Sequence, residues 1–267
     1  MRLIRKGLAL TALILSSMGA TAAIDPEQTT VLITGANRGI GLEFVRQLSE
    51  RGWNVIATVR KPENAAKLQA LADADPNIVI EQLDVTDHAR IEELATKYQD
   101  QPIDILINNA ALTPRYATAF KRVKGVDFDT ARLSFEVNAL GPLKMSQQFM
   151  PHVAASEQKK IIVISSKGGS FAESPKMPMM YSYRGSKSAL NMFMYTLSYE
   201  TTKKDIILTI LSPGMVNTTE DMKGMKLQPG TIEVNESVAK MLVVIDGLTS
   251  ENNGQFLNYE EGRVVGW

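Results

Sequence analysis

The sequence of 267 residues contains no cysteine and only two histidines, His88 and His152. The absence of cysteine excludes disulfide bonds, thiolate catalysis and cysteine-based metal sites. Two histidines are too few for the usual zinc centres, so we expect no metal site. Lysine plus arginine equals aspartate plus glutamate at 29 each, which argues against a nucleic-acid partner. The absence of cysteine, the two histidines and the balanced charge together favour a small-molecule partner.

The first 22 residues differ from the rest of the chain. Three basic residues precede an apolar run over residues 7–15, and small residues follow as far as Ala22. This layout predicts a signal peptide over residues 1–22, cleavage after Ala22 and a periplasmic or secreted protein. Two alternatives stay open: an uncleaved anchor, and a start at Met18 that gives a cytoplasmic protein. We expect no stable membrane span in the mature chain.

From residue 29 onward, short β-branched runs alternate with amphipathic helical stretches, which is typical of βαβ units. We expect one α/β domain over residues 23–267, a Rossmann-type doubly wound parallel sheet of about seven strands with helices on both faces. The expected strands cover residues 30–34, 54–59, 77–83, 103–108, 160–165, 206–211 and 255–258. A helix is expected over residues 39–51, and Pro62 is expected to open the next one. Residues 215–235 are expected to be irregular, as ligand-binding loops after such strands often are.

A glycine-rich turn joins the first expected strand to the first expected helix. Residues 34–41 read Thr-Gly-Ala-Asn-Arg-Gly-Ile-Gly. Gly35 permits the tight turn, and Gly39 and Gly41 let the backbone and the helix N-terminus approach a pyrophosphate. In this context the turn predicts a dinucleotide site.

The charge after the second strand indicates which dinucleotide is bound. An NAD enzyme usually carries an acidic residue there, whereas a 2′-phosphate needs arginine. Here Arg60 and Lys61 follow the strand, no acidic residue occurs before Glu63, and Arg38 lies in the glycine turn. NADP(H) is therefore favoured over NAD(H), unless Arg38 and Arg60 are ordinary solvated surface residues.

Tyr183 and Lys187 lie four residues apart, on one face of an expected helix. A nearby cation favours a phenolate, so we expect Lys187 to lower the pKa of Tyr183 from about 10 toward neutrality. Tyr183 could then exchange a proton with a carbonyl oxygen. Tyr181 competes for this role, but its fourth neighbour is Gly185, which supplies no charge.

Five segments, in this order, resemble the classical short-chain dehydrogenase/reductase family over residues 29–267, in particular its carbonyl-reductase-like, C-factor-like branch. They are the glycine turn, Asp84-Val85, Asn108-Asn109-Ala110, the tyrosine–lysine pair with a serine upstream, and Ser212-Pro213-Gly214 followed by Thr218. Ala111 replaces the glycine that is usual just after the third segment, so the backbone contacts there are expected to differ from the family's pattern.

The resemblance implies a role for each matching residue. Ser166, Tyr183, Lys187 and Asn138 would form the catalytic group, with Asn138 holding a water that links Lys187 to solvent. A shorter serine–tyrosine interval would select Ser170 instead. Asp84 could alternatively cap a helix, and Asn138 could be a polar residue inside one. The cofactor would contact Gly35, Asn37, Arg38, Gly39, Ile40, Gly41, Arg60, Asp84, Val85, Asn109, Ala110, Tyr183, Lys187, Pro213, Gly214, Val216 and Thr218.

The resemblance implies an NADP(H)-dependent oxidoreductase that transfers a hydride between NADPH and an aldehyde or ketone, or the corresponding alcohol. The rival hypothesis is a cofactor-binding signalling or scaffold protein of the same fold without turnover. Methionines crowd the two loops expected to flank the substrate, which indicates a broad apolar site or, almost equally, core packing. They are Met177, Met179, Met180, Met215, Met222 and Met225. The sequence leaves the substrate, the reaction direction and a homodimer open.

Overall fold

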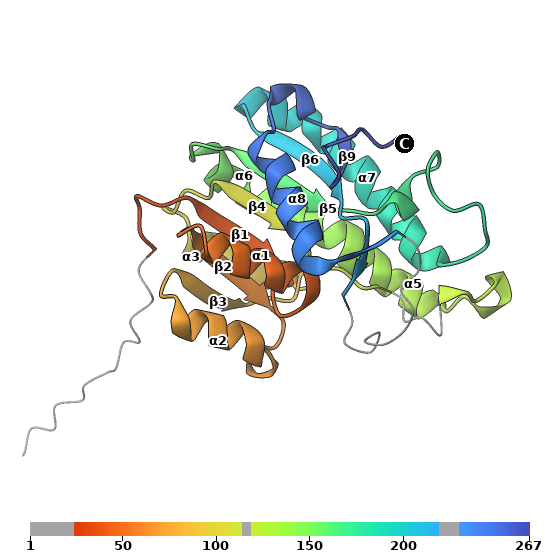
Figure 1. Ribbon diagram of the computed structural model, residues 1–267, viewed down its shortest axis with the longest axis horizontal. Helices are drawn as coiled ribbons and strands as arrows, with labels where there is room; N and C mark the ends of the chain where they lie inside the picture. The colour runs from red at the N-terminus through yellow and green to blue at the C-terminus, as the bar shows by residue number, and fades with distance from the viewer. Residues whose placement is uncertain (1–23, 114–118, 219–229) are drawn as a thin grey trace, which may run out of the picture.

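The computed structural model describes residues 24–113, 119–218 and 230–267. A seven-stranded parallel sheet forms its middle layer, in the order β3-β2-β1-β4-β5-β6-β9 (Figure 1). The strands are β1 (Thr30–Thr34), β2 (Asn54–Val59), β3 (Ile78–Gln82), β4 (Ile105–Asn108), β5 (Lys160–Ile164), β6 (Ile207–Ser212) and β9 (Phe256–Asn258). The predicted Rossmann-type fold is confirmed, and each expected strand is present with ends shifted by at most two residues.

Helices cover both faces of the sheet, which explains why the strands are apolar almost throughout. One face carries α1 (Gly39–Ser49), α2 (Ala66–Ala74) and α8 (Val234–Asp246). The other face carries α3 (His88–Lys97), α6 (Gly141–Ala154) and α7 (Tyr181–Thr201). Along β1 the side chains alternate between these layers: Val31 and Ile33 pack with the first set, and Leu32 packs with the second.

The remaining elements are short. Helix α5 (Phe128–Phe135) runs through a π-helical turn (Glu136–Leu140) directly into α6. A small two-stranded parallel sheet pairs β7 (Met215–Asn217) with β8 (Thr231–Glu233). The 3-10 turns are Pro62–Asn64, Val123–Gly125, Lys167–Gly169, Thr202–Lys204 and Ser250–Asn252. In the described ranges no helix combines the length and the apolar character needed to cross a bilayer.

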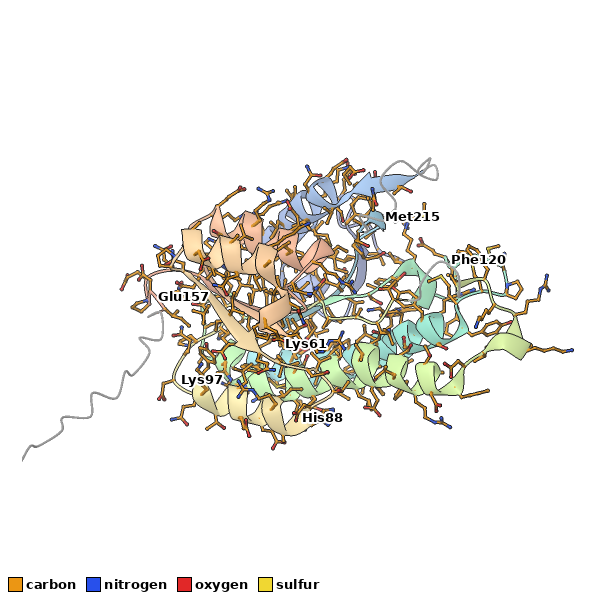
Figure 2. All side chains as sticks on the ribbon, turned by 90° about the horizontal axis from the view of Figure 1, so that it is seen from below. Lys61, His88, Lys97, Phe120, Glu157 and Met215 are labelled. Atoms are coloured by element: carbon orange, nitrogen blue, oxygen red, sulfur yellow. The ribbon has the colours of Figure 1, made fainter. Side chains whose placement is uncertain are left out.

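The strand order reverses between β1 and β4, which are hydrogen-bonded neighbours in the sheet. In open α/β sheets ligands bind in the crevice at the carboxyl ends of the strands, at this switch point. Figure 2 shows Met215 and Phe120 at the end of the molecule opposite Lys97 and Glu157. Met215 follows β6 and Glu157 precedes β5. Met215 and Phe120 therefore mark the end of the molecule at which the strands finish.

Three expectations about individual segments were wrong. Pro62 opens a 3-10 turn, and α2 begins only at Ala66. Helix α1 ends at Ser49 rather than residue 51, ahead of a turn in which Gly52 has a φ of +74°. Residues 215–235 are not irregular throughout, because they contain β7 and β8 and the start of α8. The predicted signal over residues 1–22, Met222 and Met225 lie outside the described residues.

Candidate active site

The glycine turn lies between the end of β1 and the start of α1. Gly35 and Gly39 have φ angles of +70° and +54°, in the left-handed region that favours glycine. A Cβ on Gly41 would lie 2.2 Å from the carbonyl oxygen of Gly35, so no side chain fits there. The turn therefore depends on glycine both for its backbone conformation and for its close packing.

The N-terminus of α1 suits an anion. Arg38 occupies the N-cap position without a side-chain cap hydrogen bond, and the first turn of the helix contains no acidic residue. The first N–H groups of a helix lack intrahelical partners, and a phosphate can satisfy them. Arg38 and Arg60 are exposed, and neither forms an ion pair with a residue in the described ranges. These residues fit a dinucleotide that carries several phosphates.

The segment after β4 braces the glycine turn. The side-chain Nδ2 of Asn109 donates to the carbonyl oxygens of Thr34 and Gly35 at 2.9 and 3.2 Å. The backbone N–H groups of Asn109 and Ala110 both donate to the Thr34 hydroxyl at 3.0 Å. The Asn109 side chain thus shapes the turn. Ala111 is exposed, so its methyl group does not crowd this packing.

Asp84 lies just after β3 and does not cap the next helix. Its Oδ1 accepts hydrogen bonds from the Thr86 backbone N–H at 3.0 Å and from the Thr86 hydroxyl at 2.8 Å. The N-cap of α3 is Asp87, whose carboxylate accepts from the Arg90 N–H. The alternative in which Asp84 caps the helix was therefore wrong. Val85 is buried.

Lys187 is buried in α7, and its Nζ donates to the carbonyl oxygen of Ile164, the last residue of β5, at 2.8 Å. The same Nζ lies 5.9 Å from the centre of the Tyr183 ring. Burial lowers the pKa of Lys187 to about 7 because the ammonium loses water. The amine can therefore exchange a proton near neutral pH.

Tyr183 is half-buried, and its surroundings oppose the expectation of a lowered pKa. Burial raises the pKa of the phenol, and a hydrogen bond with Ser166 lowers it by less, so the net direction is upward. The net direction is opposite to the expected lowering, because burial of the phenol dominates its pKa and the Lys187 amine is directed at the Ile164 carbonyl. A phenol with a raised pKa keeps its proton at neutral pH and can donate it.

Asn138 lies in the π-helical turn and is fully buried. Its Oδ1 accepts from the Leu112 N–H at 2.7 Å, and its Nδ2 donates to the Leu112 carbonyl at 3.1 Å and to the Ser186 hydroxyl at 2.9 Å. Ser186 in turn donates to the Tyr183 carbonyl at 2.8 Å. The Asn138 side chain thus ties the segment after β4 to α7, and both of its amide hydrogens are used within the protein.

The order and context of these elements match one protein family. A model of the short chain dehydrogenase family matches residues 29–228. The chain belongs to this family. The resemblance inferred from the motifs is thereby confirmed.

Individual relatives agree with this assignment. An uncharacterized oxidoreductase of Schizosaccharomyces pombe is 32% identical to this short-chain dehydrogenase over 248 residues, which is 87% of this chain and 96% of that protein. The NADPH-bound carbonyl reductase from chicken fatty liver superimposes with a TM-score of 0.80 and 34% identity, covering 90% of this chain and 99% of the other. Carbonyl reductase Sniffer of D. melanogaster gives 0.80 and 29%, covering 90% and 100%.

Ser170 and Tyr181, the alternatives to Ser166 and Tyr183 in this short-chain dehydrogenase, lie in different surroundings. The Ser170 hydroxyl donates to the Gly266 carbonyl at 2.6 Å and accepts from the Glu173 N–H at 2.8 Å. Tyr181 begins α7 with 42% of its surface exposed. Ser170 therefore supports the C-terminal segment, whereas Ser166 lies beside Tyr183.

The segment after β6 returns to the glycine turn. Pro213 accepts a hydrogen bond from Ser237 through its carbonyl at 2.7 Å, and Gly214 has a φ of +85°. Val216 pairs within β7. Thr218 is exposed, and its Cβ lies 3.4 Å from the place that a Cβ on Gly39 would occupy. The structure thus brings Thr218 to the start of α1.

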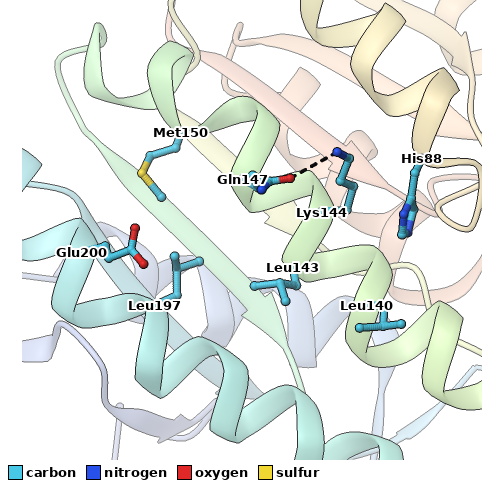
Figure 3. Close-up of a pocket in the computed structure, with 8 residues that line it drawn as sticks. All are labelled: His88, Leu140, Leu143, Lys144, Gln147, Met150, Leu197 and Glu200. Carbon is cyan, nitrogen blue, oxygen red and sulfur yellow. Dashed lines mark hydrogen bonds between the residues drawn. The ribbon is translucent and has the colours of Figure 1, made fainter.

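A separate groove of about 410 Å³ lies between α6 and α7 (Figure 3). Its apolar walls include Leu143, Met150 and Leu197, and Lys144 donates a hydrogen bond to Gln147 at its edge. None of the proposed site residues lines it. Across the described ranges, no group of three or more His, Asp or Glu residues could hold a metal ion.

The contacts that hold the loop between Ser166 and Tyr183 were not predicted from the sequence. Arg184 makes three hydrogen bonds to this loop, and Arg263 forms an ion pair with Glu173 within it. No pattern in the sequence links these residues, because Arg263 lies 90 positions from Glu173.

Proposed function

We propose that the protein is an NADP(H)-dependent carbonyl reductase that can also run in reverse as an alcohol dehydrogenase. The observation that carries this proposal is the placement of Tyr183, Ser166 and the buried Lys187 together: a Cβ on Gly168 would lie 3.3 Å from the Ser166 Oγ and 3.9 Å from the Tyr183 Cε1, and the Lys187 Nζ lies 5.9 Å from the centre of the Tyr183 ring. A proton donor, a second hydroxyl and an amine that titrates near neutrality meet at the carboxyl end of β5. This is the set of groups that reduction of a carbonyl requires.

NADPH, when bound, supplies the hydride that adds to the carbonyl carbon of the substrate. As the carbon–oxygen π bond breaks, the oxygen takes the electron pair and the phenolic proton of Tyr183, and the products are the alcohol and NADP⁺. The Gly168 N–H occupies an acceptor position on Ser166. The Ser166 hydroxyl hydrogen is therefore left to stabilise the developing negative charge. Lys187 then returns a proton to the phenolate and regains one from solvent, so each reduction takes up one proton.

We assign the preference for NADP(H) over NAD(H) to Arg60 and Arg38. Both side chains are exposed, and they have no acidic partner in the described ranges. A guanidinium that is not already paired can form charge-assisted hydrogen bonds with a 2′-phosphate. The NADPH bound to the chicken carbonyl reductase supports the same preference.

The proposed substrate is a small or medium apolar aldehyde or ketone. Met177 and Met215 expose 49% and 47% of their surface, and they follow the two strands, β5 and β6, whose ends carry the proposed site. Methionine side chains are flexible and polarizable, so they adapt to apolar substrates of different shape.

Export and a homodimer complete the proposal. Ile24 packs against the core and Asp25 pairs with Asn54, so cleavage after Ala22 and initiation at Met18 both preserve the described fold. Fractionation with N-terminal sequencing separates the two possibilities: a chain that begins at Ala23 supports export, and one that begins at Met18 overturns it.

Exposed apolar side chains on α5 and α7, such as Phe128 and Met192, support a homodimer. Light scattering on the purified protein tests this.

The test of the catalytic proposal is a panel of aldehydes and ketones with purified protein, following NADPH by its absorbance. NADPH binding is measured in parallel by calorimetry. Turnover by the wild type supports the proposal. Tight NADPH binding without turnover on any carbonyl would instead favour the signalling or scaffold alternative.

A further inference from the structure

Residues 167–180 form the loop that joins Ser166 to the helix bearing Tyr183, and Arg184 bridges this loop. Its Nε donates to the Gly168 carbonyl at 3.4 Å, its Nη1 to the Met177 carbonyl at 2.9 Å, and its Nη2 to the Ser174 hydroxyl at 2.7 Å. A planar guanidinium offers several donors in a fixed arrangement, so one side chain can hold the two ends of a loop together.

Gly168 connects Arg184 to the proposed catalytic hydroxyl. Its N–H donates to the Ser166 Oγ at 3.0 Å, while its carbonyl accepts from Arg184. A Cβ on Gly168 would lie 3.3 Å from the Ser166 Oγ, 3.5 Å from the Arg184 Cγ and 3.9 Å from the Tyr183 Cε1. The glycine is thus enclosed by the serine, the arginine and the tyrosine ring. A shift of this residue changes how Ser166 meets Tyr183.

The direction of the Gly168 hydrogen bond matters for chemistry. Because the N–H fills an acceptor position on Ser166, the hydroxyl hydrogen of Ser166 remains free to point at Tyr183 or at a substrate oxygen. Without a fixed Gly168, the serine hydroxyl could rotate and accept a hydrogen bond in that direction instead of donating one. The orientation of Ser166 therefore depends on a residue that Arg184 holds.

We propose that Arg184 is a positioning residue that holds Gly168, and through it the Ser166 hydroxyl, in the orientation needed opposite Tyr183. This inference rests on the carbonyl reductase function proposed above. Arg184 follows Tyr183 directly on α7, so it links the proton donor and the serine within one rigid unit.

Arg263 provides a matched comparison within the same protein. Its guanidinium donates to both carboxylate oxygens of Glu173, at 3.0 and 2.7 Å, on the same loop. Its other hydrogen bond goes to the Val264 carbonyl, so it binds none of the proposed catalytic residues in the described part of the chain. Arg263 thus stabilises the loop without reaching Ser166.

The kinetic test compares Arg184→Met, Arg184→Lys and Arg263→Met with the wild type. For Arg184→Met we expect kcat to fall about 10- to 100-fold with the NADPH dissociation constant changed less than about twofold, since misplacing a catalytic group by about 1 Å can cost about 100-fold. Arg184→Lys should recover part of the loss, because it keeps a charged donor at this position. The recovery should be incomplete, because an ammonium cannot make all three contacts. Arg263→Met should change kcat less than about threefold. Equal losses in the two methionine variants would overturn the proposal.

The pH profile of alcohol oxidation adds a readout that loss of stability alone would not move. Oxidation needs the Tyr183 phenolate, and the Ser166 hydrogen bond lowers the pKa of this phenol. Loosening that bond should move the midpoint of the profile to higher pH in Arg184→Met and leave it in place in Arg263→Met. An unmoved midpoint in Arg184→Met would contradict the proposed action through Ser166.

Hydrogen exchange followed by mass spectrometry tests the same contacts without turnover. In Arg184→Met we expect faster exchange in peptides that contain Gly168, whereas in Arg263→Met the increase should be confined to residues 170–173 and 263–267. If the wild type reduces no carbonyl, the proposed function fails, and exchange alone still decides whether Arg184 holds Gly168. Unchanged exchange at Gly168 in Arg184→Met would overturn the inference.

Discussion

The two sides of the crevice are held by different kinds of contact. On one side, the glycine turn is set by backbone conformation and by hydrogen bonds that Asn109, just after β4, donates to Thr34 at the end of β1, the neighbouring strand. On the other side, the loop of residues 167–180 depends on the long side chains of Arg184 and Arg263. Glycines are tightly packed on both sides, at Gly41 and at Gly169, but only the second side also depends on individual charged side chains.

The largest expected effect is on the second side, at Tyr183. Tyr183→Phe removes the proton donor and keeps the ring, so we expect kcat to fall by about 10²- to 10⁴-fold, the usual contribution of general acid catalysis. NADPH binding should stay within about threefold in calorimetry. Tyr181→Phe is the control, and its effect should be small because Tyr181 is exposed at the start of α7. Full activity in Tyr183→Phe would remove the proposed proton donor.

The next effect is on the first side, at Arg60. Arg60→Asp replaces a contact to the 2′-phosphate with repulsion and offers the ribose hydroxyls an acceptor. We expect NADPH affinity to fall about 10- to 100-fold, as loss of one charged hydrogen bond of about 1.5–3 kcal/mol implies, and the preference to turn toward NADH. Titrations of both cofactors against wild type and variant measure this. Equal wild-type affinities for NADH and NADPH would contradict the arginine argument.

Two glycine-to-alanine substitutions, one on each side of the crevice, test how tightly each glycine is packed. Gly41→Ala places a Cβ 2.2 Å from the Gly35 carbonyl oxygen, and we expect a loss of at least about 1–3 kcal/mol of stability together with weaker NADPH binding. Gly185→Ala meets no atom within 4 Å in the helix, so it should stabilise by about 0.5–1 kcal/mol. Thermal unfolding of both variants separates the two results. Similar melting temperatures would refute the close packing described for the turn.

The smallest effect concerns the ion pair that holds the loop. The hydrogen bonds from Arg263, followed by that from the Gly266 N–H, lower the pKa of Glu173 to about 2. A folded-state pKa below the ordinary value of 4.5 means that the carboxylate stabilises the fold above about pH 4.5, and that this gain disappears as the pH falls toward 2.

Glu173→Gln should therefore lower the melting temperature at pH 7 by a few degrees at most, since partly exposed ion pairs contribute about 1 kcal/mol or less. The difference from the wild type should shrink when both are measured at pH 3. A difference that stays constant between pH 7 and pH 3 would show that Glu173 acts through packing and not through its charge.

The sequence was sufficient for the features that depend on residue type and local spacing. Six of the seven strands follow from short runs that contain β-branched residues, β9 follows from the apolar pair Phe256-Leu257, and the glycine turn follows from Gly35, Gly39 and Gly41. The proximity of Tyr183 and Lys187 follows from their four-residue spacing on α7.

The sequence was insufficient where direction or distance along the chain decides the outcome. Spacing could not indicate how far burial raises the pKa of Tyr183, or that Lys187 donates to the Ile164 carbonyl, so the expected direction of the Tyr183 pKa shift was wrong. It also could not reveal that the C-terminal Arg263 reaches Glu173, because hydrogen bonds across 90 residues leave no local pattern.

The proposed reaction is tested most directly by transfer of deuteride from NADPH that carries deuterium in place of both hydrogens on the reactive carbon of its nicotinamide. With a carbonyl substrate that the wild type accepts, we expect the product alcohol to carry deuterium at its carbinol carbon, one atom for each NADPH consumed. Tyr183→Phe should bind the labelled cofactor and form almost no labelled alcohol. Unlabelled alcohol from the wild type, or equal labelling by Tyr183→Phe, would contradict the proposed reaction.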